Sequence, residues 1–249
     1  MKQRRMAALV ALGCLLPFLP QRAEAQQGGP GFLFRSPRVT LSVRAGYDVP
    51  RARSQVFDFV RSELTLDRRD FAAPSVDFSL AVRVSERLDL GVDVGTSRSE
   101  SLSEFRDWVD LDGLPIEQTT TFRRTPVTLS LRYYLTERGR RVSRLAWVPR
   151  RWTGYVGVAA GRTSYSFEQA GDFVDFETLD IFRDRFLAEG SAPLVQALGG
   201  VEYNLTPYLA LSFEGRFSWA RGDPGRDFVD FDSLDLSGFR LSAGASVRF

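Results

Sequence analysis

The amino-acid sequence predicts an all-β protein: a closed, eight-stranded, antiparallel up-and-down barrel that crosses a membrane. Three observations predict this fold: an amino-terminal export signal, eight segments in which apolar and polar residues alternate, and connections that alternate between short and long. A strand places successive side chains on opposite faces, so each segment has one apolar and one polar face. An open sheet would leave backbone groups unpaired in lipid, so the sheet is expected to close.

The amino terminus has the composition of a secretory signal. Lys2, Arg4 and Arg5 are followed by an apolar run over residues 6–19 and by the small residues Ala23 and Ala25. This pattern predicts cleavage after residue 25, because signal peptidase reads small residues at those two positions. The predicted organisation is a signal peptide over 1–25, a short segment over 26–36 and one barrel domain over 37–249.

A competing interpretation makes Cys14 a lipidated amino terminus, because Gly13 precedes it. The apolar run continues past Cys14, which favours the cleaved signal. Cys14 is the only cysteine, so cleavage leaves no residue for a disulfide or a thiolate.

Charge and composition exclude several classes of function. The 33 basic and 31 acidic residues of the chain nearly balance, and the signal holds four of the basic residues and one acidic residue. A nearly neutral mature chain offers no basic excess for nucleic acid, so no nucleic-acid partner is expected. The chain has no histidine. A Ser-His-Asp triad is therefore impossible, and we expect neither an enzyme nor a cofactor or metal site.

The eight alternating segments begin with 38–48, where apolar and polar residues exchange at every position. The others centre on residues 76–84, 88–94, 127–135, 156–160, 201–205, 209–219 and 239–249. Most approach the 9–11 residues that a tilted strand needs to cross a bilayer.

The polar face of these segments is charged with both signs, which predicts a lumen lined by ion pairs. The predicted lumen-facing charges are Arg44, Asp77, Arg83, Asp89, Asp93, Arg132, Glu202, Glu214, Arg216, Arg240 and Arg248. A soluble β-sandwich could expose the same residues to water. The connections favour the barrel, because long loops on one side and short turns on the other are typical of outer-membrane barrels. The connection over 136–150 is an exception, being long on the short side.

The carboxyl terminus resembles the closing strand of bacterial outer-membrane β-barrels. Ser242 is followed by Gly244, Val247 and the terminal Phe249, which match the polar, glycine, hydrophobic and aromatic positions of that signature. The resemblance implies recognition of Gly244, Val247 and Phe249 by the barrel-assembly machinery, and residence in outer-membrane lipid. Residues 124–135 and 199–207 also resemble the small barrels of the OmpA, OmpX and OmpW type.

An acidic–aromatic motif recurs once in each predicted long loop. Its copies over 107–114, 172–179 and 227–234 are nearly complete, and 58–63 is a degraded copy. The motif residues singled out are Asp107, Trp108, Asp172, Phe173, Asp175, Phe176, Asp227, Phe228, Asp230 and Phe231.

Four interpretations of this motif remain open. The copies could be helical turns whose apolar faces form a lid, since an initial Asp can cap a helix. They could be extensions of the strands. They could bind a cation through Asp175, Glu177, Asp230 and Asp232. They could also expose aromatic residues to an unknown surface partner.

Two functions therefore remain. The first is a structural or surface-interaction barrel whose four long extracellular loops carry the activity. The second is a narrow conduit for small or hydrophobic solutes, although eight strands leave an interior just wide enough for side chains to fill.

Overall fold

The computed structural model describes residues 31–249 except 111, 144–145 and 176. The predicted signal peptide, the first residues of the following segment and Phe176 lie outside the described residues. No helix in the described part of the chain is both long and apolar enough to cross a membrane.

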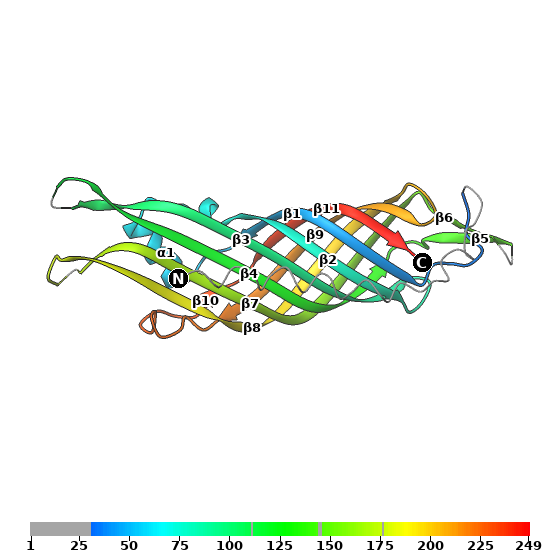
Figure 1. The fold of residues 1–249 in the computed structure, drawn as a ribbon. Coiled ribbons are helices and arrows are strands. Elements are labelled where there is room, and N and C mark those ends of the chain that lie inside the picture. Colours follow the sequence, from blue (N-terminus) through cyan, green and yellow to red (C-terminus); the bar gives the residue numbers. More distant parts are fainter. Residues whose placement is uncertain (1–30, 111, 144–145, 176) are drawn as a thin grey trace, which may run out of the picture.

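Eight antiparallel strands form a closed ring (Figure 1). They are β1 (Val39–Pro50), β2 (Ala73–Arg83), β3 (Leu88–Val109), β4 (Pro115–Tyr134), β7 (Trp152–Val174), β8 (Ile181–Asn204), β9 (Leu209–Gly222) and β11 (Gly238–Arg248). Each strand pairs with its neighbours in this order, and β11 pairs with both β9 and β1, so the ring closes. The predicted eight-stranded barrel is confirmed.

Short helices and strands lie at the two ends of the ring. The helix α1 (Gln55–Glu63), the short 3-10 helix η3 (Arg68–Phe71) and β10 (Leu234–Asp235) lie at one end. The hairpin of β5 (Gly139–Ser143) and β6 (Ala146–Pro149) projects from the other end. We call the end with α1 the loop end, and the end with the β5–β6 hairpin and the carboxyl terminus the turn end.

The expectation of four long loops is wrong for two of them. The connections at the loop end are 51–72, 110–114, 175–180 and 223–237. The second and third are short because β3, β4, β7 and β8 continue well past the predicted segments and form long hairpins (Figure 1). Polar side chains replace the outward apolar ones along these extensions, which hides the strands from a search for apolar alternation. The exceptional connection over 135–151 is long, as predicted, and contains the β5–β6 hairpin.

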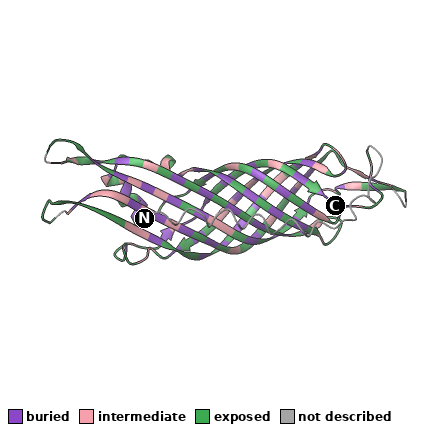
Figure 2. Cartoon of the chain, viewed as in Figure 1, coloured by how far each residue is buried: buried purple, intermediate pink, exposed green. Residues whose placement is uncertain are grey.

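Burial alternates along most of the length of the ring strands (Figure 2). The outward residues divide the barrel wall into two zones. Towards the turn end the outward side chains are apolar. On β4 and the residue that follows it, these residues run from 127 to 135, which is about the length needed to cross a bilayer. This apolar band includes Leu41, Val43, Phe78, Leu80, Leu90, Val92, Leu129, Leu131, Val156, Val158, Val195, Val201, Leu211, Phe213, Leu241 and Val247. Beyond it, most exposed residues of the long strands are polar, beginning near Arg98, Arg123 and Arg162. Leu102, Val109, Ile181 and Phe182 are exposed apolar exceptions.

Glycines let neighbouring strands close the ring. A Cβ atom on Gly244 would lie 2.0 Å from the carbonyl oxygen of Val43, and one on Gly46 would lie 2.1 Å from that of Leu241. Both glycines are at the β1–β11 seam. A larger residue at either position would therefore push the first and last strands apart.

The other carboxyl-terminal residues of the predicted assembly signature also lie at this seam. Val247 and Phe249 face outward, and the backbone N–H of Phe249 donates to the carbonyl oxygen of Val39. The amino-terminal segment crosses beneath the barrel, where Leu33 and Trp147 exchange backbone hydrogen bonds of 2.9 and 2.7 Å. Both side chains are buried, so this segment packs against β6.

Candidate functional site

The inside of the barrel contains two different regions, one charged and one apolar. All eleven predicted lumen-facing charges are on strands of the ring, and ten of them are buried inside it. Arg83 lies at the turn-end rim, where it pairs at 2.6 Å with Glu86. The charged side chains form three groups of ion pairs, stacked from the loop side of the band to the turn end.

The loop-side network contains two carboxylates and two guanidinium groups. Asp48 pairs at 2.8 Å with both Arg124 and Arg240, and Arg240 reaches Asp77 at 2.6 Å. The hydroxyl of Ser97 donates to Asp48 at 2.6 Å. Asp48 and Arg124 were not among the predicted lumen-facing charges. Both residues occupy alternating positions that face inward, and this was the available signal. However, Asp48 is the last residue of its predicted segment, and Arg124 lies before the first residue of the predicted segment 127–135.

The central network brings three arginines around two carboxylates. Glu214 lies 2.7 Å from Arg216, 3.4 Å from Arg44 and 3.6 Å from Arg132. Asp93 lies 2.5 Å from Arg132, 3.6 Å from Arg216 and 4.0 Å from Arg44. Each carboxylate therefore contacts all three cations, and buried charges are tolerated only when paired in this way.

Neutral side chains complete the central network. The Tyr155 hydroxyl donates to Glu214 at 2.8 Å, and Arg216 donates to the side-chain oxygen of Gln196 at 3.0 Å. The alternation of side chains along a strand predicts that such groups face inward, but it does not predict which charges they contact.

The turn-side network seals the other end of the charged region. Arg138 pairs with Asp89 at 2.7 Å and lies over the ring of Tyr134, 4.4 Å from its centroid. Arg248 pairs with Glu202, which also accepts a 3.2 Å hydrogen bond from the Tyr134 hydroxyl. Arg138 is in the connection before β5, where no strand parity could have identified it.

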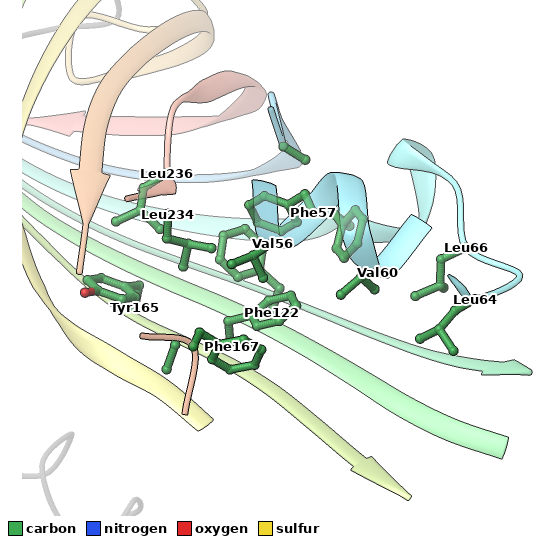
Figure 3. Packing of buried hydrophobic residues seen from close by; sticks show 14 of the residues in the cluster. Val56, Phe57, Val60, Leu64, Leu66, Phe122, Tyr165, Phe167, Leu234 and Leu236 are labelled. Atoms are coloured by element: carbon green, nitrogen blue, oxygen red, sulfur yellow. The ribbon is translucent and has the colours of Figure 1, made fainter. Parts of the chain in front are cut away.

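The apolar region fills the loop end of the barrel (Figure 3). Phe57 and Phe167 are completely buried. Phe57 meets Phe71, Phe122 and Phe167 edge-to-face, with ring centroids 4.9, 5.4 and 5.4 Å apart. Helix α1 supplies Val56, Phe57 and Val60, and inward residues of the extended strands supply most of the wall. We call this group the apolar plug.

All four copies of the acidic–aromatic motif contribute to the plug. Val60, Val174 and Phe228 belong to it, and Trp108 packs against it. Phe173 is buried beside Phe186, which packs on the same cluster. Phe231 also packs against the plug and touches Phe59 of α1. The apolar side chains of the copies therefore pack together in one cluster, which agrees with the packing part of the lid interpretation.

The copies reach the plug through different backbone conformations. The first lies in α1. In the second and third, Asp107, Trp108, Asp172 and Phe173 end the strands β3 and β7, while the copy over 227–234 forms turns. The prediction of a helical turn in every copy is thus wrong, because strand pairing continues into the second and third copies.

The acidic residues of the motif serve these turns and loops. Asp110 accepts backbone N–H bonds from Asp112 and Leu114, and Asp175 accepts them from Glu177 and Thr178. These donors hold the pKa of Asp175 below its ordinary value.

The copy in the β9–β11 connection contacts two other elements. Asp227 accepts the N–H of Leu187 on β8 at 2.9 Å, and Asp230 is exposed. Asp232 accepts the N–H of Gln55 at 3.0 Å. Within the described residues, no group of three or more His, Cys, Asp or Glu side chains could hold a metal ion.

A surface groove lies where β8 extends past β9. Pairing between these strands covers only residues 194–204 and 210–220, so the remainder of β8 has no strand on that side. The groove of about 510 Å³ is lined by Tyr165, residues 189–193 of β8, residues 221–223, Gly225, Arg226 and Val229. The hydroxyl of Tyr165 spans it to the carbonyl oxygen of Asp223 at 2.7 Å.

Comparisons with known proteins find similarity in structure only. No protein-family model matches the chain, and no curated protein matches it. Neisserial surface protein A shares 14% identity and a TM-score of 0.44, over 90% of this chain and 100% of that one. The outer membrane protein OprG from Pseudomonas aeruginosa shares 12% identity and a TM-score of 0.47, over 86% and 97%. Ail, the attachment invasion locus protein of Yersinia pestis, shares 11% identity and a TM-score of 0.44, over 85% and 99%. The similarity is to small outer-membrane barrels and concerns the fold alone.

Proposed function

We propose that the protein is a non-enzymatic outer-membrane barrel with a closed lumen, whose loop end is a rigid surface for interaction with a partner outside the cell. The observation that carries this proposal is the continuation of β3, β4, β7 and β8 beyond the apolar band as a polar-faced sheet. The apolar plug supports this sheet from inside.

The outer surface supports a position in lipid. The apolar band lies on the outside of the closed ring. Because the ring is closed, every strand edge within the band is paired. Exposed aromatic residues flank the band: Trp152, Tyr133 and Tyr208 towards the turn end, and Tyr47 and Trp219 towards the loop end. Aromatic girdles of this kind are typical of membrane barrels at both interfaces.

The interior favours a closed lumen over a conduit. Three networks of ion pairs cross the lumen within the band, and the apolar plug lies above them. An ion would have to break these pairs in order to pass. The conduit therefore remains only as the alternative that conductance would reveal.

Conductance across a planar bilayer tests the closed lumen. The refolded protein, checked first for a heat-dependent shift on a gel, is expected to give a folded but electrically silent barrel. Discrete, reproducible current steps would overturn this part of the proposal and favour the conduit.

Single-cysteine labelling tests the exposed loop end. Because the chain has no cysteine after Cys14, variants Leu114→Cys and Val229→Cys at the loop end can be compared with Val142→Cys on β5. All three side chains are well exposed. On intact cells, a membrane-impermeant maleimide is expected to label positions 114 and 229 and not 142. Labelling of 142 alone would reverse the proposed orientation.

A further inference from the structure

Exposed charge is distributed unequally between the two ends of the barrel. Past the apolar band at the turn end, the exposed acidic side chains of the described residues are only Glu86 and Glu137, and Glu86 pairs with Arg83. The exposed cations there include Arg38, Arg87, Arg140, Arg141, Arg150 and Arg151. We call these six arginines the basic collar. The loop end has the opposite character, with many carboxylates on the β7–β8 hairpin and on residues 223–235.

The collar is continuous with the surface proposed to face lipid. Arg151 precedes Trp152 on β7, and its guanidinium donates to the hydroxyl of Tyr203 at 2.8 Å. Trp152 packs against the same tyrosine, with ring centroids 4.7 Å apart. This arrangement holds a cation at the aromatic girdle, where the headgroups of a bilayer begin.

The other rim arginines surround the same edge. Arg38 precedes β1, Arg87 is in the β2–β3 turn, and Arg150 precedes β7. Arg87 has only a 3.9 Å approach to Glu137 and remains about half exposed. The six arginines of the collar outnumber this carboxylate, so the collar retains a net positive charge.

The β5–β6 hairpin holds two more arginines in a defined place. Trp147 of β6 is buried and bonded through its backbone to Leu33, and a Cβ on Gly139 would lie 2.5 Å from the Trp147 ring. The hairpin is thus held to the amino-terminal segment, and it presents Arg140 and Arg141 to solvent. Guanidinium groups match phosphate oxygens with paired hydrogen bonds.

We propose that the basic collar binds the phosphates of anionic phospholipid headgroups in the leaflet at the turn end, and so holds the barrel at a fixed depth and orientation. This inference rests on the proposed position of the apolar band in lipid. Each arginine near an anionic surface strengthens the attraction to that surface roughly fivefold. The basic collar therefore selects a class of lipid headgroup, whereas the apolar band only requires contact with lipid chains.

Fluorescence quenching by brominated lipid tests this inference, because Trp152 and Trp219 report on opposite ends of the band. One protein retains only Trp152 and another only Trp219, with the remaining tryptophans replaced by phenylalanine. Each is placed in vesicles of phosphatidylcholine containing brominated phosphatidylglycerol or brominated phosphatidylcholine. Phosphatidylglycerol is expected to quench Trp152 at an at least fivefold lower mole fraction than phosphatidylcholine, and more selectively than it quenches Trp219.

Matched variants locate the effect. Replacing the four rim arginines by glutamine (Arg38→Gln, Arg87→Gln, Arg150→Gln and Arg151→Gln) should abolish the selectivity at Trp152. The control carries four glutamines at the loop end (Arg51→Gln, Arg98→Gln, Arg123→Gln and Arg162→Gln) and should retain it. Both variants must first show the heat-dependent gel shift. If a variant does not fold, Arg140→Gln with Arg141→Gln in the exposed hairpin serves instead, and a partial loss of selectivity is expected.

The outcomes separate this inference from the proposed function. Equal quenching of Trp152 by the two lipids would confirm lipid contact and overturn the collar. An absence of quenching by either lipid, at either tryptophan, would overturn the position of the band in lipid. Inorganic phosphate at matched ionic strength should not reverse the selectivity. Reversal by phosphate, and not by chloride, would show a site for free phosphate and contradict the lipid assignment.

Discussion

The charged and apolar regions of the lumen are equally well buried, yet they are held together by different physics. In the charged region, each carboxylate pairs with one to three arginines, so each side chain depends on partners of opposite charge. In the apolar plug, rings and aliphatic groups from α1, the strands and the β9–β11 connection exclude water without a required partner. Loss of one group should therefore leave an unpaired charge in the first region and a cavity in the second.

The largest expected effect comes from neutralising the central carboxylate. Glu214→Gln leaves Arg44, Arg132 and Arg216 with Asp93 as their remaining carboxylate, and should lower the free energy of unfolding by about 3–5 kcal/mol. Guanidinium titrations of the protein in lipid vesicles measure this change. Glu100→Gln is the matched control, because Glu100 pairs with Arg98 at 2.7 Å on the exposed surface. Its expected cost is at most about 1 kcal/mol, and equal effects of the two variants would contradict the role given to burial.

The second effect concerns the plug alone. Phe57→Ala should remove about 3 kcal/mol of local stability, because the ring is completely enclosed. Hydrogen exchange should accelerate in 55–63 and in 228–236, while the heat-dependent gel shift persists. Phe59→Ala on the same helix is the control, since Phe59 is 41% exposed. Loss of the gel shift in Phe57→Ala would show that the plug is needed to close the barrel.

A smaller effect should follow from removing a hydrogen bond between the two long connections at the loop end, 51–72 and 223–237. Gln55 donates its N–H to Asp232 at 3.0 Å, and its side-chain oxygen accepts the N–H of Asp232 at 3.1 Å. Gln55→Ala removes the second bond, which should cost about 1 kcal/mol. Faster hydrogen exchange at Asp232, with unchanged exchange in β3 and β4, would agree. Unchanged exchange at Asp232 would mean that the plug alone holds the connections together.

The smallest effect is a dependence on pH at the tip of the β7–β8 hairpin. The pKa of Asp175 is lowered from 3.8 by the N–H groups of Glu177 and Thr178. Their stabilisation is therefore complete above pH 3.8 and is lost as the pH falls through the lower, folded-state pKa. Amide chemical shifts of Glu177 and Thr178 should follow this titration in the native chain and not in Asp175→Asn. A titration that persists in the variant would assign it to another group.

The charged region was more predictable than the plug. Strand parity alone placed Arg44, Asp93 and Glu214 on one face, since side chains alternate with a period of two. Parity carries no information on which strands meet across the lumen, so it could not pair Asp48 with Arg124 or Arg240. Arg138 lies outside any strand, and its position follows from the packing of the turn end.

The repeated motif indicated that its apolar residues could pack together. It did not predict the backbone conformation of each copy. The same acidic–aromatic pattern occurs in a helix, at two strand ends and in turns, because neighbouring strands decide its local conformation. Long strands with polar outer faces also lack the apolar alternation that predicts a membrane-crossing segment. Their inward aromatic residues, such as Phe122 and Phe167, looked like parts of loops for this reason.

The sequence by itself determined the number of strands, the sign of their two faces and the carboxyl-terminal closing strand. These properties depend on local periodicity and on residues near one another in the chain. Only the tertiary structure decided how far the strands extend, which charges pair and how the four motif copies meet in one plug. Those properties depend on contacts between distant segments, whose energies exceed the local conformational preferences of the same residues.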